Sequence, residues 1–179
     1  KLLNRYGMKN ILVLDSKGIL APGRKDLDPH KRALAKLTNS RNFFGGIEEA
    51  LLGADAGGGV SGPVALTREN ISTMNKRSIV FAMANPIPEI MPHEAVNGGA
   101  AIVSPGRSDF PNQINNALAF PGVFRGALDN RIRRITDAMK LKAALAIAGL
   151  VAKPTARNIV PSIFDPRLVP TVARIIRDK

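Results

Sequence analysis

The chain has 179 residues, 45% of them hydrophobic and 22% charged, which is enough for one globular domain with its own core. Cysteine is absent, so a disulfide framework and a thiolate metal site are excluded. The apolar runs are far shorter than the ~20 residues that a membrane span needs. We therefore expect a cytoplasmic protein with no membrane partner, because a chain without cysteine fits a reducing compartment.

The formal net charge of +12 is the unusual feature of the composition. It fits either phosphate contacts to a nucleic acid or a solvated basic surface, with some cations serving a phosphate-bearing cofactor. Aromatic residues make up only 4% and tryptophan is absent, which leaves few stacking platforms for single strands. The basic residues are spread along the chain, and we expect no nucleic-acid partner.

The first segments resemble part of a dinucleotide-binding unit. Residues 1–7 predict the end of a helix, and residues 10–15 predict an apolar strand that ends in Asp15. In βαβ units of this kind, an acid ~20 residues after a glycine-rich loop binds the ribose hydroxyls. That distance leads back beyond residue 1, so we expect the first strand and its glycine loop to be missing from this chain.

One glycine-rich stretch, residues 57–62, formally satisfies the G-x-G-x-x-G pattern. We reject it as the pyrophosphate loop, because the preceding residues predict only a weak strand and the next strand does not end in an acid. Helices are expected over residues 29–37 and 47–52 and from Thr67 onward, the first capped by Asp28 and the third by Thr67.

A buried strand over residues 79–84 ends at Asn85-Pro86, because proline cannot donate to a sheet ladder. A further parallel strand is expected over residues 100–103. Asn85 therefore lies at the carboxyl end of a central strand, where open α/β sheets bind their ligands. The pattern predicts an α/β fold with a Rossmann-like, doubly wound parallel sheet that is incomplete at its N-terminus.

Four amides are concentrated in residues 112–116, and an amide offers donors and an acceptor without charge. This suits binding of a polar small molecule, and it suits a loop built from Asx turns equally well. For Asp109, in the same loop, an Asx turn is favoured over a functional role. Helices follow from Val123, from Thr136 and from Leu168 to the C-terminus. There is no linker or repeat, so residues 1–179 form one expected domain.

Several short sequence motifs, in their order along the chain, resemble the C-terminal, NAD(P)-binding part of the malic enzymes. The motifs are Asp15-Ser16-Lys17-Gly18, Gly59-Val60-Ser61-Gly62-Pro63, Ala84-Asn85-Pro86 with Pro88-Glu89-Ile90, residues 106–122, and Pro161-Ser162 with Phe164-Asp165-Pro166-Arg167. The resemblance implies oxidative decarboxylation of malate to pyruvate and carbon dioxide, with NAD or NADP and with Mg²⁺ or Mn²⁺. It also implies a homodimer or a larger homo-oligomer.

The resemblance assigns roles to eight residues. Those implied for the cofactor are Asp15 at the adenosine ribose, Ser16 and Lys17 beside it, Val60 and Ser61 along the channel, and Asn85. Those implied for malate are Asn85, Asn115 and Asn116. The family's catalytic tyrosine and lysine, its metal-binding acids and its glycine loop fall before residue 1. We therefore expect no catalytic residue and no metal ligand in this chain, and no malate-dependent turnover by the chain alone.

Two alternatives remain at this point, namely another NAD(P)-dependent dehydrogenase on the same sheet and a non-catalytic basic interaction module. Asp15 favours NAD over NADP, because its carboxylate repels a 2′-phosphate. Lys17 and neighbouring cations offset that repulsion, and the family uses both coenzymes with an acid at this position.

Overall fold

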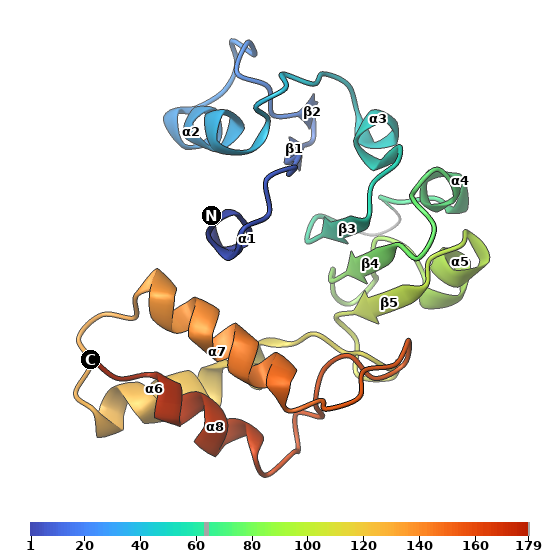
Figure 1. The fold of residues 1–179 in the computed structure, drawn as a ribbon. Coiled ribbons are helices and arrows are strands. Elements are labelled where there is room, and N and C mark those ends of the chain that lie inside the picture. Colours follow the sequence, from blue (N-terminus) through green and yellow to red (C-terminus); the bar gives the residue numbers. More distant parts are fainter. Residues whose placement is uncertain (63–64, 179) are drawn as a thin grey trace.

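The structure is a computed structural model that describes residues 1–62 and 65–178 (Figure 1). Its elements in chain order are α1 (Leu2–Tyr6), β1 (Leu14–Asp15), β2 (Gly18–Ile19), α2 (Pro29–Thr38), α3 (Ile47–Leu51), β3 (Ala56–Gly59), α4 (Arg68–Ser72), β4 (Ile79–Ala82), α5 (Pro92–Asn97), β5 (Ile102–Pro105), the 3₁₀ helix η1 (Asn116–Leu118), α6 (Phe120–Asp129), α7 (Asp137–Gly149) and α8 (Leu168–Ile175). None of the described helices is both long and apolar enough to cross a membrane.

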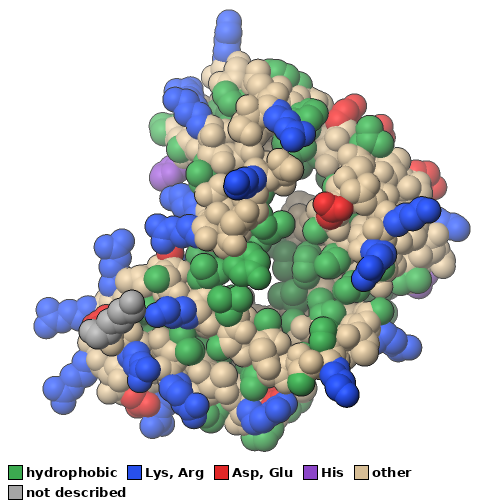
Figure 2. Space-filling model, viewed as in Figure 1, with side chains coloured by type: hydrophobic (Ala, Val, Ile, Leu, Met, Phe, Trp, Pro, Cys, Tyr) green, Lys and Arg blue, Asp and Glu red, His purple; other side chains and the backbone are tan. Residues whose placement is uncertain are grey.

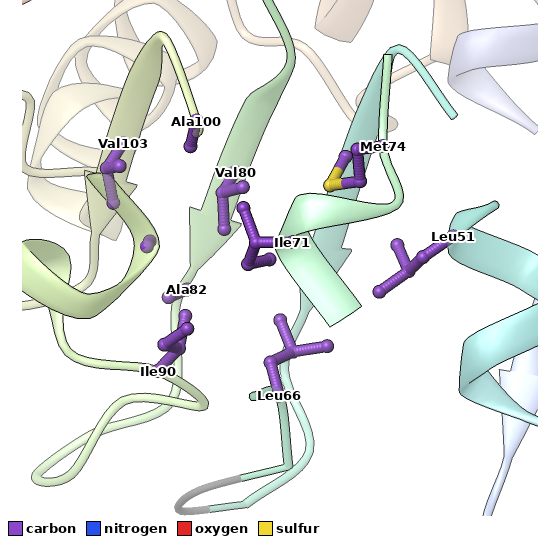
Figure 3. Close-up of a cluster of buried hydrophobic side chains, with 10 residues drawn as sticks. Leu51, Leu66, Ile71, Met74, Val80, Ala82, Ile90, Ala100 and Val103 are labelled. Carbon is purple, nitrogen blue, oxygen red and sulfur yellow. The ribbon is translucent and has the colours of Figure 1, made fainter. Parts of the chain in front are cut away.

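The strands β3, β4 and β5 form a parallel sheet in that order, which confirms the predicted α/β class. In its register Gly57 lies opposite Val80, and Val80 lies opposite Val103. The helices α4 and α5 connect the strands and cover the sheet, and Ile71 of α4 points toward Val80 (Figure 3). The resulting core cluster contains Leu51, Leu66, Ile71, Met74, Val80, Ala82, Ile90, Ala95, Ala100 and Val103.

The strand predicted for residues 10–15 is wrong in its extent and its pairing. Only Leu14 and Asp15 form a strand, and it pairs antiparallel with β2 as a small hairpin separate from the parallel sheet (Figure 1). Next to the hairpin, the N–H of Leu20 donates to the carbonyl of Val13 over 2.8 Å. A strand needs a neighbour to pair its backbone groups, and the described chain places no parallel strand beside residues 10–13.

The predicted helix starts are confirmed by their caps. The carboxylate of Asp28 accepts from the N–H of Lys31 over 2.9 Å at the start of α2. At α4, the Thr67 hydroxyl accepts from the N–H of Asn70 over 3.2 Å, and the Asn70 side chain accepts from the N–H of Thr67 over 3.0 Å. Asn70 thus completes a capping box in which glutamate is the usual partner.

The C-terminal helices form a second cluster of their own. The helices α6 and α8 lie side by side, and α7 packs against α8 (Figure 1). On α7, Met139 and Ala143 are buried, while Val172 of α8 and Ile176, directly after it, are fully buried. Figure 2 shows lysine and arginine side chains around the outline of the molecule, while hydrophobic side chains gather about a central hollow.

The segment of small residues before Val60 does form a strand, β3, although its sequence predicts strand only weakly. A Cβ at Gly58 would lie 3.7 Å from the Cβ of Phe81, which is ordinary contact. We expect Gly58→Ala to raise the free energy of unfolding by about 0.4–1 kcal/mol, because alanine reduces the freedom of the unfolded chain. Urea denaturation would measure this, and a lower midpoint would mean that this backbone does not tolerate a side chain.

Candidate functional site at the carboxyl edge of the sheet

An open cavity of about 330 Å³ lies where the strands β3 and β4 end. Residues 60–62, directly after β3, form one wall, and residues 83–87, directly after β4, form the other. The cavity brings together three of the residues singled out in the sequence, namely Val60, Ser61 and Asn85. This is the edge at which an open parallel sheet binds its ligands. Pro63, the last residue of the motif around Ser61, lies outside the described residues.

Asn85 carries the polar group best placed for a ligand at this cavity. Its side chain is exposed, and its amide has no hydrogen-bond partner among the residues that the structure describes. The peptide bond to Pro86 is cis, and the carbonyl of Pro86 accepts from the guanidinium of Arg107 over 3.4 Å. An amide in this position can donate to a carboxylate and accept from a hydroxyl group without adding charge.

Asp109 is paired with Arg107, which lies beside the cavity wall. The two side chains approach to 2.7 Å, and the guanidinium of Arg107 holds the pKa of Asp109 below its usual value. The side-chain contact that the structure gives for Asp109 is therefore this ion pair, rather than the expected Asx turn.

In the amide-rich segment, residues 112–116, the side chain of Asn112 stabilises the fold rather than facing a ligand. Asn112 is buried, and its side-chain nitrogen donates to the carbonyls of Val103 and Ala156 over 3.1 and 2.8 Å. Its side-chain oxygen accepts from the N–H of Ile159 over 2.9 Å. Asn112 thus fastens the end of β5 to the loop after α7, and its amide is fully occupied.

The other two predicted malate ligands, Asn115 and Asn116, lie further along this segment. The side chain of Asn115 accepts from the N–H of Ala117 over 2.9 Å and so caps the 3₁₀ helix, of which Asn116 is the first residue. Both side chains are exposed, and neither is among the residues that line the cavity. Their joint action with Asn85 therefore stays a prediction.

Asp15 lies in the small hairpin and is surrounded by cations. It forms ion pairs of 2.9 Å with Arg24 and 2.7 Å with Lys31, and it accepts from the N–H of Lys17 over 3.0 Å. Arg24 first and Lys31 second hold the pKa of Asp15 well below its usual value. Ser16 and Lys17 are exposed in the turn that follows. A ribose hydroxyl group would therefore share this carboxylate with two cations.

Among residues 1–62 and 65–178, no group of three histidine, cysteine, aspartate or glutamate side chains is arranged to hold a metal ion. The residues described here therefore do not fit a divalent ion, and we assign no step of metal chemistry to them. The cavity walls place the amide of Asn85 and the hydroxyl group of Ser61 among apolar residues, which is the usual lining of a small-molecule site.

Sequence reasoning assigned no role to Glu89, which lies beneath the cavity and is only 1% exposed. Its two carboxylate oxygens accept from the N–H groups of Ser61, over 3.0 Å, and Ala84, over 2.9 Å. A signal was present in the sequence, because an acid directly after a buried strand and a Pro-x-Pro turn is out of place unless it has partners.

The parallel sheet with a ligand cavity at its carboxyl edge defines the class as a Rossmann-like nucleotide-binding domain. The family model described as "Malic enzyme, NAD binding domain" matches residues 4–175. This chain belongs to the malic enzyme family and corresponds to that domain.

Curated relatives and a solved structure agree with this assignment. The chain is 47% identical to the bifunctional malic/malolactic enzyme of Bacillus subtilis, covering 98% of the chain and 44% of that protein. It is 42% identical to the NADP-dependent malic enzyme of Rhizobium meliloti, covering 93% and 24% respectively. The crystal structure of the NAD-dependent malic enzyme of Thermotoga maritima matches with a TM-score of 0.92 and 41% identity, over 98% of the chain and 46% of that structure. The chain thus spans less than half the length of these relatives.

Proposed function

We propose that the chain is the NAD(P)- and malate-binding part of an enzyme that oxidises and decarboxylates malate to pyruvate and carbon dioxide. The observation that carries this proposal is the cavity at the ends of β3 and β4, which brings Ser61 and Asn85 together. Membership of the malic enzyme family supports malate and NAD(P) as its ligands. Membership of the family disfavours both an unrelated dehydrogenase and a basic interaction module.

The proposed roles are those of binding and orientation. Val60 and Ser61 line the channel for the nicotinamide half of the cofactor, and Asp15, Ser16 and Lys17 take the adenosine side. Asn85 holds malate against the nicotinamide ring, and Asn115 and Asn116 approach from the amide-rich segment. Neutral amides suit this task, because they bind a dicarboxylate without changing the charge at the reacting carbon.

The proposed cofactors are NAD or NADP, with Mg²⁺ or Mn²⁺ held by residues outside this chain. Asp15 alone would repel a 2′-phosphate, but Arg24 and Lys31 lie against its carboxylate, and Lys17 in the turn pairs with the neighbouring Asp26. These cations screen that repulsion, so the charge at the ribose site does not exclude NADP. We further propose that the full-length protein is a cytoplasmic homodimer or larger homo-oligomer.

On its own, the chain is expected to produce no reduced NAD or NADP from malate in the presence of Mn²⁺, because its described residues offer no metal cluster and the proposed acid and base lie elsewhere. The full-length protein that contains this chain should produce reduced NAD or NADP from malate under the same conditions. Absorbance of the reduced cofactor measures both reactions, with a reaction lacking malate as the control. Turnover by the chain alone would overturn the expected inactivity, and an inactive, folded full-length protein would overturn the proposed function.

A further inference from the structure

A buried carboxylate joins the two walls of the cavity. Glu89 is 1% exposed, and no lysine, arginine or histidine within the described ranges lies at ion-pair distance from it. Burial of a charge without a cation is costly, so the hydrogen bonds to this group must be well made. Its hydrogen-bond partners are the backbone N–H groups of Ser61 and Ala84, one to each oxygen.

These two N–H groups come at the point where the pairing of the strands ends. The N–H of Met83 donates to the carbonyl of Gly59 over 3.2 Å, which continues the pairing of β3 with β4. Ser61, two residues after Gly59, and Ala84, directly after Met83, lie where the backbones of the two segments diverge to form the walls of the cavity. The carboxylate of Glu89 accepts from both and so replaces the missing pairing between the walls.

Only a carboxylate meets this arrangement in full. Two donors converge on one side chain, and an ionised carboxylate has two acceptor oxygens and no donor. Glutamine would offer one acceptor, and its NH₂ group would face the second N–H group. The space also depends on Gly59, because a Cβ there would lie 2.5 Å from Oε1 of Glu89.

Glu89 is itself held firmly from below. Its carbonyl accepts from the N–H of Leu66 over 3.0 Å, Pro88 before it is buried, and Ile90 after it belongs to the core of the sheet. The carboxylate is therefore anchored in the core and fixes the loops above it.

We propose that Glu89 is a positioning residue for the cofactor, which sets the separation of the Ser61 and Asn85 loops by bracing both backbones. This inference rests on the proposed function, because it takes the cavity to hold the nicotinamide half of NAD(P). Glu89 does not line the cavity, so it acts through Ser61 and Ala84, which do.

The test compares three variants of the full-length protein. Glu89→Gln is expected to raise the Kd and the KM for the reduced or oxidised dinucleotide about tenfold, because one charge-assisted hydrogen bond to a wall is lost. Gly59→Ala should raise them similarly by displacing the carboxylate. Gly58→Ala is the matched control, since a Cβ there meets only the Cβ of Phe81 in ordinary contact and should leave both values unchanged. Fluorescence titration with NADH or NADPH gives the Kd, and thermal unfolding gives the Tm.

The outcomes separate this inference from the proposed function. If the unmodified protein binds neither dinucleotide, the proposed function fails. If it binds one, and Glu89→Gln is folded and binds equally tightly while its Tm falls, Glu89 is only structural and the inference is overturned. Should Glu89→Gln not fold, amide hydrogen exchange of the unmodified protein decides. The amides of Ser61 and Ala84 should exchange at least about tenfold more slowly than those of Gly62 and Asn85, and equal rates would overturn the inference.

Discussion

Replacing Gly126 by alanine is expected to lower the free energy of unfolding by about 1–3 kcal/mol, because the extra methyl group has no space between α6 and α8. A Cβ at this position would lie 2.8 Å from the Cβ of Ile176 and would overlap the carbonyl oxygen of Ala173. Neither atom belongs to the flexible end of a side chain, so the helices themselves have to move apart. Gly122, one turn earlier, meets the Cβ of Val172 in the same way.

Gly149→Ala is the matched control for this change. Gly149 is also helical, but a Cβ there meets no atom within 4 Å. Alanine at that position is expected to be neutral or to stabilise by up to about 1 kcal/mol, because it favours the helix. Thermal unfolding would compare the two variants, at about 2–4 °C per kcal/mol for a chain of this size. An unchanged Tm for Gly126→Ala would show that α6 and α8 are not packed as closely as described.

The second large effect is expected at Asn85. In the full-length protein, Asn85→Ala should lower kcat/KM for malate about 5- to 150-fold, since loss of a hydrogen bond to a charged ligand costs about 1–3 kcal/mol. The exposed amide of Asn85 has no partner within the described chain, so its removal leaves the fold intact. The effect should therefore appear in the kinetics and not in the Tm.

Asn97→Ala serves as the control for this measurement. Asn97 is an exposed asparagine at the end of α5 and has no place in the cavity. Steady-state rates over a range of malate concentrations, at saturating cofactor and Mn²⁺, give kcat/KM for each variant. A value for Asn85→Ala equal to that of the unmodified protein would remove Asn85 from the malate site.

Most of the fold follows from local patterns in the sequence. Residues 79–84 predict a buried strand because they are apolar on both faces, and β4 occupies the first four of them. The caps at Asp28, Thr67 and Thr136 mark helix starts because their side chains accept from the orphan N–H groups of the first turn. These features need no information about distant parts of the chain.

The features that sequence did not predict depend on distant partners. Residues 10–13 have strand-like composition, but a strand forms only beside another, and the described chain supplies none there. The amide of Asn112 looks like a ligand group in the sequence, yet its partners at Ala156 and Ile159 lie more than 40 residues away. The role of Glu89 depends likewise on Ser61, 28 residues before it. The position of Asn85 follows from the sequence because the carboxyl ends of parallel strands meet at one edge, whereas Ser61 is implied by the family resemblance alone.

The position of β3 has a consequence for how this polypeptide behaves in solution. Within the described residues, β3 is hydrogen-bonded to β4 on one side only, and its four residues are alanine and glycine. The side chains of β3 itself therefore supply neither bulk nor charge to shield its outer row of amide and carbonyl groups, whereas natural proteins normally protect such an edge. At high concentration the chain is therefore open to lateral addition of a foreign strand along this border.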